Sequence, residues 1–179
     1  MKTFEELKED LLERAKKHHA CQDGYSMGLN AKSKQDLLKA ITDNWYWVLS
    51  TSKMIDANYL EKNFTEEELT EAGIYTRKEH TSNAKSFACG SATVEAYGSA
   101  TVEAYDSATV EAYDSAKVEA YDSAKVEAYG SAKVEAYDNS YVEDCTGNIN
   151  TVSDHGIVKD YHNHKIYIKK GKFKIIEIE

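Results

Sequence analysis

The stretch Ser91-Ala92-Thr93-Val94-Glu95-Ala96-Tyr97-Gly98 is the first clear copy of an eight-residue repeat that continues to Asp138. Six near-perfect copies lie in this segment, and degenerate copies flank it at residues 83–90 and 139–146. In each copy the second, fourth and sixth residues are Ala, Val and Ala, while the third and fifth are polar. This alternation with a period of two predicts a β-strand with one buried face. The Tyr-(Gly/Asp)-Ser junction that follows is typical of a turn.

Strands this short bury too little apolar surface to stand alone, so the copies are expected to stack into a β-solenoid whose coils advance by about 4.8 Å. If each copy forms one side of a flattened coil, a turn takes 16 residues and the eight copies give four coils. A three-sided coil of 24 residues is the alternative. The small Ala and Val side chains favour the thinner, two-sided coil. Cys89 and Cys145 would then lie about 17 Å apart along the stack, too far for a disulfide, and are predicted to be free thiols.

The segments on either side of the repeat have different patterns. Residues 1–82 read as a small helical bundle, with capping boxes at Thr3-Phe4-Glu5-Glu6 and Thr65-Glu66-Glu67-Glu68. We expect this head to cover the open first coil, because an exposed sheet edge promotes aggregation. Residues 147–179 are expected to supply two strands that turn at Gly171, either as a closing cap or as a homodimer interface.

The predicted fold class is therefore α+β. A helical head over residues 1–82 precedes a β-solenoid over residues 83–146, and a C-terminal β cap or dimerisation segment follows over residues 147–179.

The net charge of −9 is concentrated on the repeat. Residues 1–82 carry −3, residues 83–146 carry −8 and residues 147–179 carry +2. This balance argues against direct nucleic-acid binding, which depends on neutralising phosphates with Lys and Arg. No apolar run approaches the roughly 20 residues that span a bilayer, and the polar start does not resemble a secretory signal. With three cysteines and no such signal, we expect a cytoplasmic protein.

The repeat is expected to present an extended acidic surface to a protein partner. Its acidity is highest over residues 99–114, where Thr stands in place of the lysines of the later copies. The candidate partner-binding residues are Glu95, Glu103, Asp106, Glu111, Asp114, Glu119 and Asp122. A simpler interpretation is that these acids only keep the solenoid soluble and discourage pairing of its edges.

The repetition itself argues against catalysis. An acid/base pair needs two carboxylates in different environments, whereas a repeat gives each glutamate nearly the same one. The sequence contains neither a glycine-rich phosphate loop nor a nucleophile motif. We therefore predict a protein that is not an enzyme and needs no cofactor or metal. The weak metal-ligand candidates are His155, His162 and His164, which a surface loop beside the cap would explain more simply.

Residues 99–106, Ser-Ala-Thr-Val-Glu-Ala-Tyr-Asp, resemble the octapeptide-repeat proteins of phages, prophages and mobile elements of gut bacteria. The head is similar too. Its segments 20–25 (Ala-Cys-Gln-Asp-Gly-Tyr) and 44–47 (Asn-Trp-Tyr-Trp) look like the Ala-Cys-x-(Glu/Asp)-Gly … Asp-Trp-x-x-Trp pattern that often precedes such repeats. Here Asn44 replaces Asp, and the second tryptophan comes one residue early. In architecture alone, the repeat is also analogous to pentapeptide-repeat solenoids, some of which mimic DNA and inhibit DNA-handling enzymes.

The resemblance implies a protein of phage or mobile-element type that inhibits host nucleic-acid-processing or defence machinery such as CRISPR effectors. The implied partner is a protein with a basic nucleic-acid-binding surface, which an acidic, DNA-mimicking face would occupy. The alternative is a structural spacer or assembly module in which the solenoid is a rigid rod.

Overall fold

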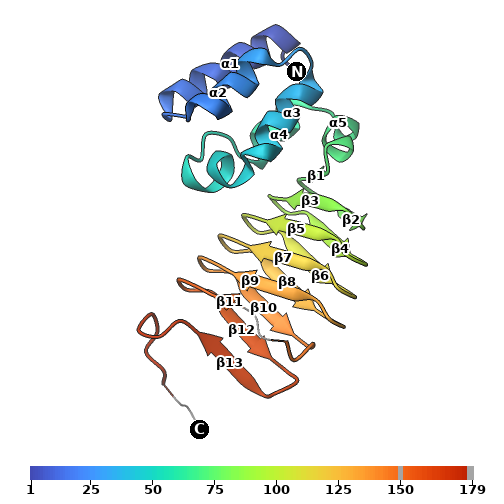
Figure 1. Cartoon of the computed structure of the whole chain (residues 1–179), viewed down its shortest axis with the longest axis vertical. Coiled ribbons are helices and arrows are strands. Elements are labelled where there is room, and N and C mark those ends of the chain that lie inside the picture. The colour runs from blue at the N-terminus through green and yellow to red at the C-terminus, as the bar shows by residue number, and fades with distance from the viewer. Residues whose placement is uncertain (149–150, 177–179) are drawn as a thin grey trace. The chain divides into compact units, whose positions relative to one another are not determined.

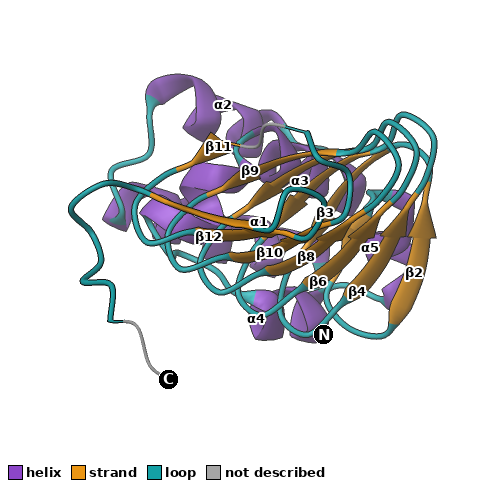
Figure 2. Cartoon of the chain, turned by 90° about the horizontal axis from the view of Figure 1, so that it is seen from below, coloured by secondary structure: helices purple, strands orange, loops and turns teal. Residues whose placement is uncertain are grey.

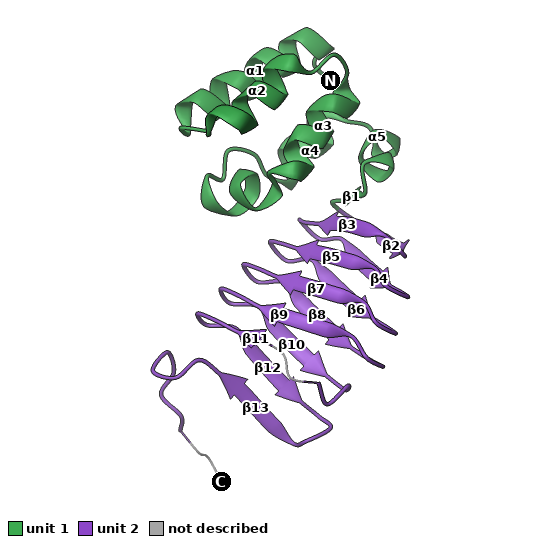
Figure 3. Ribbon diagram, viewed as in Figure 1, with its two compact units in different colours: residues 1–76 green, residues 77–179 purple. Residues whose placement is uncertain are grey.

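The computed structural model describes residues 1–148 and 151–176. The chain divides into two compact units, Met1–Thr76 and Arg77–Glu179 (Figure 3). The first unit is mainly helical and the second is a solenoid of parallel strands, so the predicted α+β class is confirmed (Figure 1).

The first unit is built from short, well-capped helices. Its elements are α1 (Phe4–Lys17), α2 (Gln22–Asn30), α3 (Lys34–Asp43), a π-helix (Trp47–Thr51), α4 (Ala57–Asn63), α5 (Glu66–Glu71) and β1 (Ile74–Tyr75). Both predicted capping boxes are confirmed, at the starts of α1 and α5. Leu7, Leu38 and Leu60 are fully buried and Trp45 is 2% exposed, so the core lies among α1, α3, α4 and the segment that follows α3. That this head covers the solenoid stays a prediction.

The strands of the second unit are short and regularly spaced. They are β2 (Glu79–Ser82), β3 (Lys85–Ala88), β4 (Thr93–Ala96), β5 (Thr101–Ala104), β6 (Thr109–Ala112), β7 (Lys117–Ala120), β8 (Lys125–Ala128), β9 (Lys133–Ala136), β10 (Tyr141–Asp144), β11 (Thr151–Val152), β12 (Ile157–Asp160) and β13 (Lys165–Ile168). The unit begins before the expected residue 83, because β2 already pairs in parallel with β4.

Successive copies of the repeat alternate between two sheets, which Figure 2 shows as two layers. In this unit, sheet A has the order β3-β5-β7-β9-β11, and sheet B has the order β13-β12-β10-β8-β6-β4-β2. Val94 pairs with Val110, and Val110 pairs with Val126, so each coil takes 16 residues. The two-sided coil is therefore confirmed over the three-sided alternative.

The interior of the solenoid is a stack of identical small side chains. Ala96, Ala112 and Ala128 lie one above another on sheet B and are all 0% exposed. The inward valines of both sheets are equally buried. Because coils repeat every 4.8 Å or so, an Ala or Val in the middle coils has the same residue above and below it, whereas Ala96 also pairs with Ser82 and Ala128 with Asp144. The core therefore has room for side chains of this size and for little else.

The corners explain why Gly and Asp share the eighth position of the repeat. This position has a left-handed backbone throughout, with φ of +63° at Gly98 and +54° at Asp114, for example. Glycine adopts this region freely, and aspartate tolerates it better than most other residues. The Asp114 carboxylate also accepts a hydrogen bond from the backbone N–H of Gly98, one coil earlier, at 3.0 Å. The same bond joins Asp106 to Gly90 at 3.1 Å.

Replacing Asp114 with alanine is expected to lower the free energy of unfolding by about 1–2 kcal/mol. The change removes the hydrogen bond to Gly98 and leaves a Cβ without compensation in a left-handed corner. Asp114→Asn, which keeps a side-chain acceptor and tolerates the same φ, should retain most of the stability. Urea unfolding of the two variants checks this, and equal losses would contradict the role assigned to the corner carboxylate.

The parallel ladder continues further toward the C-terminus than expected and ends at an antiparallel strand. Val142 pairs in parallel with Val158, and β13 then pairs antiparallel with β12. Two strands were expected, one on each side of Gly171. Among the described residues, only the first of these forms, as β13. The segment 173–176 has no strand and leaves Ile175 74% exposed, and a strand without a packed face is not stable. Residues 177–179, where the second strand was expected to end, lie outside the described residues.

Within residues 1–148 and 151–176, the helices are all too short or too polar to cross a membrane.

Candidate functional site: the acidic surface of the solenoid

The outward face of sheet B carries an uninterrupted column of glutamates. Glu95 pairs with Glu111, Glu111 with Glu127, and Glu127 with Glu143. Neighbouring strands lie about 4.8 Å apart, so the column presents one carboxylate at each such step. The strands β4, β6, β8 and β10 contribute these four glutamates and one lysine, Lys125. We call this set of glutamates the sheet B column.

Sheet A carries a similar column, but its charge is balanced. The strands β3, β5, β7 and β9 contribute three glutamates and three lysines: Glu103, Glu119, Glu135, Lys85, Lys117 and Lys133. The Lys85 ammonium lies 3.1 Å from the Glu103 carboxylate. Burial raises the pKa of Glu103, and the neighbouring Glu119 raises it further, although Lys85 acts in the opposite direction. The excess negative charge of the two strand faces is therefore on sheet B.

The seven acidic residues predicted as one face are not brought together. Because successive copies alternate between the sheets, Glu95 and Glu111 lie on sheet B, whereas Glu103 and Glu119 lie on sheet A. The three aspartates lie at corners: Asp106 and Asp122 follow strands of sheet A, and Asp114 follows a strand of sheet B. Residues 99–114 therefore form one complete coil with two opposite faces. The acidic residues that do lie in one row are those of the sheet B column, which adds Glu127 and Glu143.

Tyrosines hold the glutamates in place, a contact that sequence reasoning missed. On sheet B, the Tyr113 hydroxyl donates to the Glu111 carboxylate at 2.6 Å, and Tyr129 donates to Glu127 at 2.7 Å. Equivalent bonds join Tyr97 to Glu95, Tyr121 to Glu119, and Tyr137 to Glu135. The sequence does contain a pattern that indicates this contact. Every near-perfect copy places Tyr two residues after Glu, so both side chains lie on the outward side of the strand end.

The tyrosine rings also stack along both edges of the solenoid. On the sheet B edge, the ring centroids of Tyr97 and Tyr113 lie 4.8 Å apart, and those of Tyr113 and Tyr129 lie 5.2 Å apart. On the sheet A edge, Tyr105, Tyr121 and Tyr137 stack with spacings of 4.7 Å. The tyrosines therefore form two columns, one on each edge. On sheet B, stacked rings bonded to carboxylates hold Glu95, Glu111 and Glu127 in one row.

These contacts hold the tyrosines in the neutral form. The hydrogen bond to Glu127, together with burial, raises the pKa of Tyr129 to about 12. The hydrogen bond to Glu111 is the main reason why the pKa of Tyr113 is also raised. Burial is the main cause at Tyr121, followed by its bond to Glu119.

We expect the solenoid to lose stability when the pH rises from about 10 to about 12. An unfolded tyrosine has a pKa near 10, so a phenol whose folded pKa is higher stabilises the fold fully below about pH 10 and loses that contribution as it ionises. Tyrosinate absorbance and urea unfolding followed in parallel should show late ionisation and falling stability in this range. Glu127→Gln should bring the pKa of Tyr129 closer to its ordinary value. Titration of all 13 tyrosines near pH 10 in the folded protein would contradict the account.

Of the weak metal-ligand candidates, His164 lies at a left-handed backbone position with φ of +55°, and the other two histidines contact other residues. The His155 ring lies edge-on to Phe173 with 5.7 Å between ring centroids, and the His162 ring lies against Gly147, where an added Cβ would come within 2.6 Å of it. Among the described residues, no three His, Cys, Asp or Glu side chains gather as metal ligands would. Cys21, Cys89 and Cys145, all in the described part of the chain, form no disulfide, as expected for the latter two.

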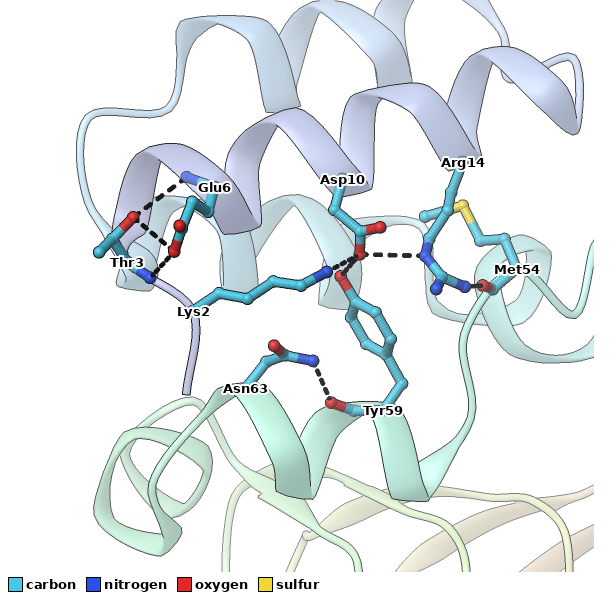
Figure 4. Close-up of polar contacts among 8 residues, drawn as sticks. All are labelled: Lys2, Thr3, Glu6, Asp10, Arg14, Met54, Tyr59 and Asn63. Atoms are coloured by element: carbon cyan, nitrogen blue, oxygen red, sulfur yellow. Dashed lines mark hydrogen bonds and ion pairs between the residues drawn. The ribbon is translucent and has the colours of Figure 1, made fainter.

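A polar cluster in the head is structural (Figure 4). One carboxylate oxygen of Asp10 accepts from the Lys2 ammonium at 2.8 Å, the Arg14 guanidinium at 3.1 Å and the Tyr59 hydroxyl at 2.5 Å. Burial alone would raise the pKa of Asp10, but these three hydrogen bonds outweigh it and lower the pKa. Arg14 also donates to the carbonyl of Met54 at 2.9 Å. The cluster joins α1 to α4, and its groups are engaged with one another.

Comparisons with known protein families, curated proteins and solved structures found no match to this chain. Its function is therefore inferred from its own geometry and charge.

Proposed function

We propose that this chain is a non-catalytic binding protein that uses the sheet B column to occupy a basic, nucleic-acid-binding surface of a partner protein. The observation that supports the proposal is the register of Glu95, Glu111, Glu127 and Glu143, which aligns four carboxylates on one side of the solenoid. Sheet A serves as the neutral opposite face, because its strands β3, β5, β7 and β9 carry equal numbers of outward glutamates and lysines.

The spacing of the column is close to that of a polyanion. It places one negative charge about every 4.8 Å, and a single DNA strand places one about every 3.4 Å along the helix axis. The charges are also fixed before binding, because tyrosine hydroxyls hold the carboxylates of Glu95, Glu111 and Glu127. Fixed charges lose less conformational entropy on association than mobile ones, and a charged row steers a basic partner into encounter.

The biological role we propose is inhibition of a host nucleic-acid-processing or defence complex by a phage or mobile-element protein. This finer statement depends on the resemblance of the octapeptide units and of the head pattern, together with the acidic column. An anti-CRISPR-like inhibitor is one example of this class. Its site of action would be the host cytoplasm.

A rigid spacer is the second candidate, and the unbroken ladder from β4 to β12 favours it. The 16-residue coil allows the two candidates to be separated. Removing residues 99–114 deletes one whole coil and keeps every remaining copy on its own sheet. Removing residues 107–114 alone would move all later copies to the opposite sheet.

We expect the 16-residue deletion to weaken partner binding, because it shortens the sheet B column by one glutamate. The 8-residue deletion should weaken it more, since it moves Glu127 and Glu143 to the other sheet and places Glu119 and Glu135 beside Glu95 together with their lysines, Lys117 and Lys133. Binding of partners captured from a host lysate to each immobilised variant measures both effects. A spacer predicts unchanged binding by the 16-residue deletion, and that result would contradict the proposed function.

A further inference from the structure

The helical head contains a cavity that neither the solenoid nor the proposed function uses. It has a volume of about 350 Å³ and lies within the first unit, among α1, α2, α3 and the segment that follows α3. Its floor is buried and apolar, with Leu11, Leu37, Ile41 and Val48. Its rim includes the exposed side chains of His19 and Cys21, so the cavity opens to solvent where α1 joins α2.

Missing side chains on α2 keep this cavity open. Gly24 and Gly28 are one helical turn apart and both line it, and α2 buries none of its side chains. A Cβ added at Gly28 would meet only Leu12, at an ordinary contact distance of 3.4 Å. Glycine inside a helix is less favourable than alanine, and cores of small domains seldom leave voids of this size. A larger residue at Gly28 would improve both the helix and the packing, yet the space is open.

The head pattern noted in the sequence converges on this cavity. Its two segments are far apart in the chain but supply much of the wall, through Ala20, Cys21, Gly24, Tyr25, Asn44 and Trp47. The Asn44 amide nitrogen donates to the Ala40 carbonyl at 2.9 Å, which orients the side chain and directs its carbonyl oxygen toward Gly24. An oriented acceptor in an apolar wall is typical of a ligand site.

The chemistry of the wall restricts the ligand. Among the described residues that line the cavity, none is an aspartate, glutamate, lysine or arginine. A charged ligand would lose its hydration without gaining an ionic partner. An apolar cavity of about 150 Å³ holds one benzene ring, so this volume suits about two fused rings. We propose that the head binds a neutral, largely apolar aromatic molecule of that size, whose single hydrogen-bond donor is recognised by Asn44.

The test is calorimetric titration of the full chain with 2-naphthol, a neutral two-ring donor, and with 2-naphthoate, its charged analogue. Saturable one-site binding of 2-naphthol is expected, with 2-naphthoate at least about tenfold weaker. Gly28→Leu fills the cavity and should abolish binding while preserving or raising the melting temperature. Ser26→Ala, on the same helix but outside the cavity wall, should bind like the wild type.

Ala40→Leu fills the cavity from α3 and gives the same test if Gly28→Leu does not fold. The proposal is overturned if 2-naphthol shows no saturable binding, if 2-naphthoate binds as well as 2-naphthol, or if a folded, filled variant keeps the wild-type affinity. None of these outcomes depends on the sheet B column, so this site and the proposed function are tested separately.

Discussion

Replacing Ala112 with aspartate is expected to unfold most of the solenoid. Ala112 is fully buried on β6 and lies between Ala96 and Ala128 of the neighbouring coils. A carboxylate there would be buried among methyl groups without a partner. Leaving a buried charge uncompensated costs about 3–5 kcal/mol, which is a large part of the roughly 5–15 kcal/mol that stabilises a typical domain.

The chain itself shows what a buried aspartate needs at this position. Asp144 occupies the same inward column as Ala112 and is fully buried, but its carboxylate accepts hydrogen bonds from the Thr146 N–H at 2.8 Å and the Thr146 hydroxyl at 2.7 Å. Asp160 is held in the same way by Asn163. Asp114 stands two residues after Ala112, as Thr146 stands two residues after Asp144. An aspartate at position 112 would therefore face a second carboxylate where Asp144 has the Thr146 hydroxyl.

Urea unfolding followed by circular dichroism measures the effect of Ala112→Asp. Thr109→Asp is the matched control, because it adds the same charge on the outward side of the same strand. Its free energy of unfolding should change by less than about 0.5 kcal/mol. Equal stability of the two variants would contradict the assignment of inward and outward positions.

Neutralising the sheet B column is expected to weaken binding of a basic partner by about 100-fold at low salt, which corresponds to about 2.7 kcal/mol. The variant is Glu95→Gln, Glu111→Gln and Glu127→Gln combined. It removes three charges that lie in one row and keeps the shape of each side chain. The difference should shrink as ionic strength rises, because salt screens exposed charges over shorter distances.

The matched control changes the same residue types on the other face. Glu103→Gln, Glu119→Gln and Glu135→Gln remove three charges and also break tyrosine–glutamate or ion-pair contacts, so losses of stability are comparable. Partner affinity should change by less than about threefold, because these charges face away from the partner. Equal weakening by the two triple variants would mean that total charge, and not the sheet B face, determines binding.

The repeat made most of the fold predictable. The Ala-Val-Ala alternation identifies the inward face, and the eight-residue period sets the strand length. The corner residues are also consistent with their surroundings, because Asp114 and Gly98 both occupy a left-handed backbone. Each of these patterns is local and is repeated in every coil. A single atypical residue therefore does not change the predicted fold.

The parts that were not predicted depend on contacts between distant residues. The division of the glutamates between two faces follows from a two-sided coil, but the seven candidates were taken from both faces together, and Glu103 and Glu111 lie on opposite sheets. The start of the second unit was missed because Glu79–Ser82 lacks the repeat pattern and becomes a strand through its pairing with β4. The cavity in the head was not predictable either, since its wall is assembled from residues 20–25 and 44–47 only after the helices pack.

Under the proposed function, the sheet B column and nucleic acid compete for one surface of the partner. The most direct measurement is displacement of labelled duplex DNA from the purified partner by increasing amounts of this chain. We expect full displacement by the wild type and by the sheet A variant, with about 100-fold more of the sheet B variant required. Simultaneous binding of DNA and this chain to the partner, in a stable ternary complex, would contradict it.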